Sequence, residues 1–175
     1  MIVREAELTD AFSIAKVNID SWRNTYKGII ADEYLNNLNY EKREQAMKNI
    51  IINSTKDKKY VFVAEDNMDG VIGFVSCGKE REDDKNYKGE LYSIYILKAY
   101  QNKGIGIGKL LLSRAMDKLK ENNLFPMIIW VLEENLQACN FYEQMNGRRY
   151  KVGYISIGNE EYNSVAYSFG FGEKS

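Results

Sequence analysis

Hydrophobic and polar positions follow two different periods along the chain, and their order predicts a mixture of helices and strands. Residues 2–8 predict a short strand, after which Thr9 or Asp10 offers a helix N-cap. Apolar residues then recur at steps of three and four, as they do on one face of a helix. These residues are Phe12, Ala15, Ile19, Trp22 and Tyr26. A second helix is predicted over residues 32–53.

The central third of the chain predicts a β-hairpin followed by a further strand. Strand-like runs at residues 60–65 and 71–77 are joined by residues 66–70, whose Asp-Gly step supplies the positive φ of a tight turn. A charged loop, residues 79–88, leads into the apolar run 90–97. A strict two-residue period gives this run two faces, one with Glu90, Tyr92, Ile94 and Ile96 and the other with Leu91, Ser93, Tyr95 and Leu97.

The last third of the chain predicts two helices and three strands. A glycine-rich turn opens the first helix, whose apolar stripe consists of Leu111, Leu112, Ala115, Met116 and Leu119. A buried strand at residues 126–132, a helix at 136–145 and two strands at 148–157 and 164–171 follow. The order β-α-α-β-β-β-α-β-α-β-β predicts one α/β (mixed α+β) domain over residues 1–175, built on a central sheet.

The composition restricts the chemistry more than the fold. The chain of 175 residues has Lys+Arg 24, Asp+Glu 25, a net charge of −1, no histidine and two cysteines. The balanced charge argues against a nucleic-acid partner, and the lack of histidine excludes Ser–His and Cys–His hydrolases and His-bearing metal sites. We therefore expect no metal and no nucleic acid, and no membrane partner because no apolar run could span a bilayer. The sparse cysteines, Cys77 and Cys139, favour a cytoplasmic location.

Three alternate glycines, Gly104, Gly106 and Gly108, lie at the start of a predicted helix. Free N–H groups and the helix dipole at such a terminus bind anions, and glycine lets a phosphate approach the backbone. A P-loop would need glycine at Lys103 and Ser or Thr at Leu110, so this motif is excluded. A Rossmann fingerprint with different glycine spacing and a helix-capping loop without a ligand stay open as alternatives.

The glycine-rich turn belongs to a longer pattern. Gln101-x-x-Gly104-x-Gly106 follows a strand that ends in Ile94-Tyr95-Ile96, and Asn135-x-x-Ala138-x-x-Phe141-Tyr142-Glu143, followed by Gly147, lies downstream. Upstream stands Ser21-Trp22-Arg23-x-Thr25-Tyr26-x-Gly28-Ile29, followed by Tyr34-Leu35. The first pattern resembles the acetyl-CoA signature of the GNAT superfamily of N-acetyltransferases. The second is similar to the other CoA-side motif of that family, and the third resembles the first two helices of many bacterial members.

The resemblance implies a particular fold and activity. The implied fold is the GNAT acyl-CoA N-acyltransferase fold, a mostly antiparallel seven-stranded sheet flanked by about four helices. The implied reaction transfers an acetyl group from acetyl-CoA, the cosubstrate, directly to a primary amine of a small molecule or peptide. A GNAT-fold sensor that binds acyl-CoA without turnover is the alternative. The oligomeric state, monomer or homodimer, stays open.

The resemblance also implies where acetyl-CoA binds. In that family the turn holds the pyrophosphate, and the thioester carbonyl and pantetheine lie along the strand backbone at Ile94 to Ile96. A repeated Gly-Ile step before Leu111-Leu112 departs from the usual spacing, so the amides that face the pyrophosphate lie anywhere between Asn102 and Lys109. The implied cofactor-binding residues are Ile94, Tyr95, Ile96, Gln101, Asn102, Lys103, Gly104, Ile105, Gly106, Ile107, Gly108, Lys109, Asn135 and Tyr142.

Two residues are candidates for proton transfer. The resemblance implies Tyr142 as the general acid that protonates the CoA sulfur, with a plain core aromatic as the alternative. It implies Glu90 as the general base, acting itself or through water, with a solvated residue at a strand start as the alternative. Asn135 either binds CoA or caps the helix that carries Tyr142, and both roles are compatible.

The acceptor side carries less information. Trp22, Tyr26 and Tyr34 could wall a small amine site between the first helices and the sheet, together with Tyr92. The first two also belong to the apolar helical stripe, and a core role is the alternative for them. The pattern does not identify the amine.

Overall fold

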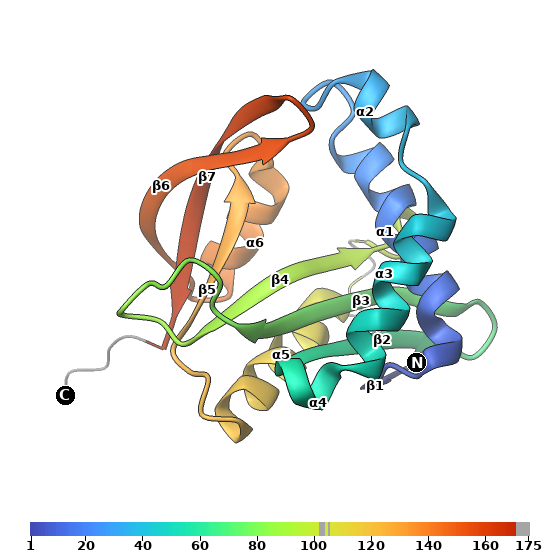
Figure 1. Cartoon of the computed structure of the whole chain (residues 1–175), viewed down its shortest axis with the longest axis horizontal. Helices are drawn as coiled ribbons and strands as arrows, with labels where there is room; N and C mark the ends of the chain where they lie inside the picture. The colour runs from blue at the N-terminus through green and yellow to red at the C-terminus, as the bar shows by residue number, and fades with distance from the viewer. Residues whose placement is uncertain (102–103, 105, 171–175) are drawn as a thin grey trace.

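The computed structural model describes residues 1–101, 104 and 106–170 and contains one seven-stranded sheet (Figure 1). Its strand order is β1-β2-β3-β4-β5-β7-β6. The strands are β1 (Ile2–Glu5), β2 (Lys59–Asp66), β3 (Gly70–Lys79), β4 (Gly89–Ile96), β5 (Met127–Leu132), β6 (Arg148–Ile157) and β7 (Glu160–Phe169). The helices are α1 (Ala11–Thr25), α2 (Asp32–Asn36), α3 (Tyr40–Ile52), α4 (Ser54–Asp57), α5 (Ile107–Glu121) and α6 (Leu136–Gln144). The short 3₁₀ helices are η1 (Leu8–Asp10) and η2 (Lys98–Tyr100).

The sheet is antiparallel except where β4 meets β5. These two strands pair in parallel at only two positions, Gly89 with Met127 and Glu90 with Ile128. Beyond these pairs they diverge, and the sheet opens between two wings, one made of β1 to β4 and the other of β5, β7 and β6 (Figure 1). The prediction of a mostly antiparallel, seven-stranded sheet is therefore confirmed, and its one parallel contact leaves most of the facing edge of β4 without a strand partner.

Helices cover both faces of the sheet (Figure 1). On one face, α5 packs Leu111 and Leu119 against the side chains of β2, β3 and β4. On the opposite face, Ile14 and Val17 of α1, with Met47 of α3, pack on β2 and β3. Burial of these two apolar layers drives the association of helices and sheet. None of the helices within the described residues is long and apolar enough to cross a membrane.

The helical predictions needed two corrections. The single helix predicted over residues 32–53 is divided into α2 and α3, because Asn39 interrupts it and caps α3 by accepting a hydrogen bond from the Lys42 N–H at 2.8 Å. The short helix α4 follows at residues 54–57, beyond the predicted range. The described residues thus contain six α-helices where about four were expected. In α1, Phe12 is 54% exposed, whereas the neighbouring Ala11 is fully buried. The buried face is rotated from the one predicted.

A β-bulge in β4 changes which side chains share a face. Ser93 pairs with Ser76, but the next pair joins Cys77 to Leu91, so Tyr92 is an extra residue on β4. Consequently Leu91 packs on the same side as Ile94 and Ile96, toward α5. The strict alternation predicted for residues 90–97 is wrong at this point. Because neighbouring side chains on a strand alternate, Glu90 lies on the face opposite to Ile94.

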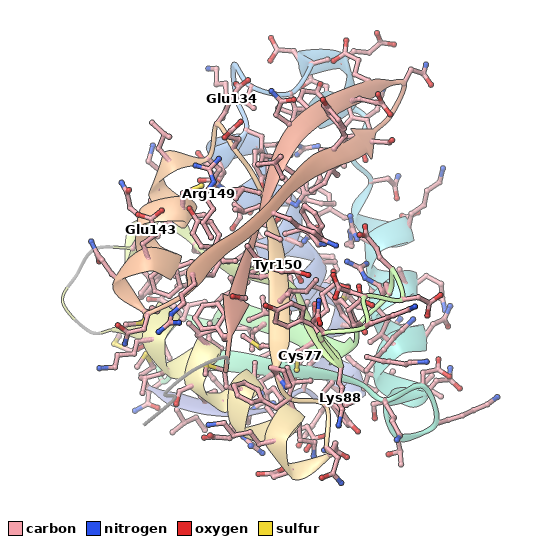
Figure 2. The ribbon with its side chains drawn as sticks, turned by 90° about the vertical axis from the view of Figure 1, so that its left-hand side faces the viewer. Cys77, Lys88, Glu134, Glu143, Arg149 and Tyr150 are labelled. Carbon is pink, nitrogen blue, oxygen red and sulfur yellow. The ribbon has the colours of Figure 1, made fainter. Side chains whose placement is uncertain are left out.

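The loop between β3 and β4, residues 80–88, connects the two wings of the sheet at the closed end of the opening. From this loop, Asp84 accepts a hydrogen bond from the Lys151 ammonium of β6 at 2.9 Å, and the Asn86 amide donates to the Tyr150 hydroxyl at 3.1 Å. The Tyr87 ring contacts the Tyr150 ring edge-on, with centroids 4.8 Å apart. Figure 2 shows Tyr150 on the face of β6 turned away from α6. The loop therefore contacts β6 directly, although β5 and β7 separate β4 from β6 in the sheet, and we call this set of contacts the latch.

Candidate active site

A groove of about 560 Å³ lies where β4 and β5 diverge. It is bounded by the last residues of β4, the turn after it, the start of α5 and one side of α6. Its lining residues include every predicted cofactor-binding residue that the structure describes: Ile94, Tyr95, Ile96, Gln101, Gly104, Gly106, Ile107, Gly108, Lys109, Asn135 and Tyr142. The other three, Asn102, Lys103 and Ile105, lie outside the described residues.

The start of α5 turns backbone N–H groups into this groove. Gly106 is the N-cap, with a left-handed φ of 70°, and the first helical hydrogen bond runs from the Leu110 N–H to the Gly106 oxygen at 3.0 Å. The N–H groups of Ile107, Gly108 and Lys109 therefore precede the helical ladder. Such groups, together with the helix dipole, favour an anion at the groove end.

The three glycines of the turn are required for different physical reasons. Gly104 and Gly106 have φ values of 73° and 70°, a backbone region that costs a residue with a side chain roughly 1–2 kcal/mol. Gly108 is the second residue of α5, and a Cβ atom there would lie 3.2 Å from the Phe141 ring of α6. The first two glycines shape the turn, and the third permits close packing of α5 against α6.

The free edge of β4 forms another wall of the groove. The Leu97 N–H donates to the Ile72 oxygen of β3 at 2.9 Å, so the alternating backbone groups of Ile94 and Ile96 turn toward β5. Gln101 donates its side-chain amide to the Ile96 oxygen at 2.7 Å and accepts from the Gln137 amide at 3.3 Å. Gln101 thus ties the end of β4 to α6 and leaves the backbone of Ile94 facing the groove.

Tyr142 lies within α6, one side of which forms the inner wall of the groove. Asn135 caps this helix by accepting a hydrogen bond from the Ala138 N–H at 3.2 Å. The Tyr142 ring packs against Tyr167 and Phe169, at centroid distances of 5.9 and 6.4 Å, and is 3% exposed. Burial raises the pKa of the Tyr142 phenol, so the hydroxyl keeps its proton at neutral pH. Within the described residues, no hydrogen bond to this hydroxyl is found.

Glu90 lies outside the groove lining. It is 1% exposed, and its carboxylate accepts two bonds from Arg81, from the side-chain Nε at 3.0 Å and from the backbone N–H at 3.3 Å. The Arg81 Nη2 also pairs with the other carboxylate oxygen, and the guanidinium lies over the Tyr92 ring at 4.4 Å. The carboxylate is thus neither solvated nor free, because a cation satisfies both of its oxygens.

The predicted acceptor residues separate into two groups. Trp22 contacts Tyr26 edge-on at 5.0 Å and Tyr34 at 6.1 Å, in a cluster that joins the end of α1 to the β6–β7 hairpin. Tyr92 stays apart, with its hydroxyl donating to the Lys79 oxygen at 2.6 Å. None of the four lines the 560 Å³ groove.

Several groove residues were not predicted. Ala138, Phe141 and Met145 recur at helical spacing in the sequence, a pattern that fits a core stripe, and in the structure they pack against the core and also line the groove on its α6 side. Periodicity cannot distinguish a side chain under a ligand groove from one under another helix. The remaining unpredicted lining residues are Thr25, Tyr100, Gln137, Asn140 and Gln144, all polar or partly polar.

The fold and the groove define the class of protein. A sheet opens around a groove whose one end suits an anion and whose inner wall holds a buried, protonated phenol. This arrangement fits a transferase that binds a long, phosphate-bearing donor. The model of the Acetyltransferase (GNAT) family matches residues 20–147, and the chain belongs to this family. The chain is a GNAT-family N-acetyltransferase.

Known relatives support the same assignment. The chain is 41% identical over 147 residues to the uncharacterized N-acetyltransferase YuaI of Bacillus subtilis, covering 84% of this chain and 80% of YuaI. It is 28% identical over 141 residues to a spermidine N(1)-acetyltransferase of Thermoplasma acidophilum, covering 80% of this chain and 83% of that protein.

Solved structures that contain coenzyme A or acetyl-CoA show the same fold. The PaiA N-acetyltransferase of Thermoplasma acidophilum, in complex with coenzyme A, aligns with a TM-score of 0.75 and 23% identity, covering 96% of this chain and 98% of that one. The yncA protein of Salmonella typhimurium, with acetyl-CoA, aligns with a TM-score of 0.72 and 19% identity, covering 100% and 96%. The expected GNAT fold is thereby confirmed.

The close contact at Gly108 yields a testable prediction. Gly108→Val places two methyl groups against the Phe141 ring and displaces it into the groove, so the dissociation constant for CoA should rise about tenfold. Ser113→Val, on the exposed surface of the same helix, should leave it within twofold. Isothermal titration with CoA measures both. Equal affinities for the two variants would show that the Phe141 wall does not contact CoA.

Proposed function

We propose that this N-acetyltransferase transfers the acetyl group of acetyl-CoA directly to a primary amine of a small molecule or peptide. One observation carries the proposal: a single groove connects the free N–H groups of α5 to the buried hydroxyl-bearing side chain of Tyr142. An anion-binding end and a proton donor at the inner wall are the two features that transfer from a CoA thioester requires.

The described residues fit acetyl-CoA. The N–H groups of Ile107, Gly108 and Lys109, with the Lys109 ammonium, would hold the pyrophosphate at the start of α5. The unpaired edge of β4 at Ile94 would accept the pantetheine amides as an added strand. The bound cosubstrate supplies a thioester-activated acetyl group. The chain's residues orient it and exclude water on the α6 side.

Tyr142 acts as the general acid in this proposal. Its pKa is raised by burial, so the phenol is protonated and can donate at the sulfur position as the thiolate leaves. Burial in the same groove also disfavours the charged CoA thiolate, so the pKa of the thiol rises toward that of the Tyr142 phenol, which donates the proton. A core role for the ring does not conflict with this function, because the ring packs against Tyr167 while the groove reaches the same residue.

Water is the proton acceptor that the geometry favours. Glu90 is held by Arg81 on the face of β4 opposite to Ile94, so accepting a proton would break a buried ion pair. A water molecule at the mouth between the wings meets no such cost. Glu90 as the base is the alternative, and the substitution described below separates the two.

Direct transfer fits the state of the two cysteines. Cys77 and Cys139 are free and buried. Burial raises the pKa of the Cys77 thiol to about 12 and also raises that of Cys139, so neither supplies the thiolate that an acyl-cysteine route needs. Free thiols also agree with the proposed cytoplasmic location.

The function is tested by acceptor-dependent release of CoA thiol from acetyl-CoA. The panel contains spermidine, because one relative is a spermidine N(1)-acetyltransferase, and peptides, because a second relative is the N-alpha-acetyltransferase 30 of Schizosaccharomyces pombe. We expect release that saturates with at least one primary amine. CoA binding without release for any amine would favour the sensor instead.

Removing the Tyr142 hydroxyl should separate chemistry from binding. Tyr142→Phe keeps the ring contacts but loses the acid, so kcat should fall about a hundredfold, the lower range for one acid–base group. The dissociation constant for CoA should stay within twofold. Tyr154→Phe, at a 72% exposed position, is the control. A kcat equal to that of the wild type would remove Tyr142 from the mechanism.

Replacing Glu90 tests the identity of the base. Glu90→Gln leaves Arg81 with a weaker partner and should lower the free energy of unfolding by about 2 kcal/mol, a value reduced from that of a fully buried pair because Arg81 is half exposed. The acid limb of the pH profile of kcat/KM should be unchanged. Loss of that limb in the variant would instead assign the base to Glu90.

A further inference from the structure

Gln101, directly after the short helix η2, turns its side-chain amide back onto the end of β4. Its Nε2 group donates to the Ile96 oxygen at 2.7 Å, and its Oε1 atom accepts from the Gln137 amide of α6 at 3.3 Å. All three residues line the 560 Å³ groove. Both ends of the Gln101 carboxamide are therefore engaged at the groove wall, one by β4 and the other by α6.

The Ile96 oxygen belongs to the free edge of β4. The next residue, Leu97, donates its N–H to the Ile72 oxygen of β3 at 2.9 Å, so the backbone groups of Ile96 point to the other side of the strand. On that side a neighbouring strand would donate an N–H group, but β5 has already diverged after the pair of Glu90 with Ile128. The Gln101 amide thus takes the place of the missing strand at this oxygen.

A donor of the CoA type needs the same oxygen. Its pantetheine arm contains amide groups, and an extended arm that adds to the edge of β4 bonds strand carbonyls through amide N–H groups. Gln101 offers the Ile96 oxygen a group of the same chemistry, a neutral amide N–H. The arm and Gln101 therefore compete for one acceptor, and exchange of one for the other keeps the number of hydrogen bonds constant.

A second cavity beside the groove has room for the displaced side chain. Its volume is about 350 Å³, and it shares four lining residues with the groove: Thr25, Gln101, Asn135 and Gln137. Lys98 and Glu134 also line it and offer a carboxamide one hydrogen-bond donor and one acceptor. Moving Gln101 into this cavity also breaks its bond to Gln137, which at 3.3 Å is longer than a typical N–H···O bond.

We propose that Gln101 is an internal competitor of the donor: its amide occupies the Ile96 oxygen in the empty groove, and the pantetheine amide of acetyl-CoA replaces it on binding. When CoA leaves, Gln101 returns, so the oxygen keeps a hydrogen-bond donor throughout the cycle. Because Gln101 competes with the arm, it lowers the affinity for acetyl-CoA and for the product CoA and favours product release. The inference rests on the proposed function in taking acetyl-CoA as the donor.

The binding test compares the wild type with Gln101→Met, which keeps the length of the side chain but has no amide. Without the competing bond, the dissociation constant for CoA should fall about fivefold, the equivalent of one hydrogen bond. The dissociation constant for 3′-phospho-ADP, the part of CoA that lacks the pantetheine arm, should stay within about twofold. Isothermal titration measures both, and Gln101→Ala should give the same two results. An unchanged or raised dissociation constant for CoA in both variants would overturn the proposal, because Gln101 would then stay in place beside the arm.

A matched control and a direct observation of the side chain complete the test. Gln45→Met removes the same type of bond, from the Gln45 amide to Asn49 at 3.3 Å on α3, and should change neither affinity. In the NMR spectrum of the wild type, the side-chain amide signal that Gln101→Met removes should move on addition of CoA and much less with 3′-phospho-ADP. A signal that stays in place with CoA, or that moves equally with both ligands, contradicts the exchange.

The outcomes also separate this inference from the proposed function. If CoA binds but no amine is acetylated, the proposed function fails, and the affinities of the Gln101 variants still decide on the competition. If an amine is acetylated but CoA binds the variants no more tightly than the wild type, only the role of Gln101 is rejected. A wild type that does not bind CoA would overturn both.

Discussion

The structure depends on a parallel pairing that stops after two residue pairs. Strands β4 and β5 bond at Gly89 and Glu90 and then separate, so the middle of the sheet contains an edge that a continuous ladder would satisfy. An unpaired strand edge is a strong binding surface for another extended chain. The antiparallel strands on either side stabilise the two wings, and the groove exists because the wings cannot close. The start of α5 and the face of α6 then supply the remaining walls.

The bulge at Tyr92 gives the two faces of β4 separate tasks. It returns Leu91 to the α5 side together with Ile94, which keeps that face apolar beneath the groove. It also places Glu90 on the other face, where Arg81 neutralises it. One strand thereby presents an apolar face toward α5 and a paired carboxylate on the opposite face.

Local sequence patterns predicted the elements well because periodicity, caps and turns act over a few residues. The glycine-rich turn, the Asn135 cap and the sequence of strands along the chain could all be inferred in this way. The mostly antiparallel arrangement of those strands was implied by the family resemblance. The bulge at Tyr92 could not, since it depends on the register between two strands rather than on either strand alone. The Glu90 partner was hidden for a similar reason, because Arg81 is nine residues away and their pairing depends on how the loop folds back onto β4.

The contacts between the β3–β4 loop and β6 join the two wings of the sheet at one end only. The Asp84–Lys151 pair and the Tyr87–Tyr150 contact pin the wings at one end, close to the only backbone pairing between β4 and β5. A rotation of the wings about this joined end would change the groove width most at the ends of β4 and β5 farthest from it. The start of α5 and Asn135 lie toward these far ends of the two strands. A small rotation of this kind would therefore change the contacts to a bound molecule far more than it would disturb the core.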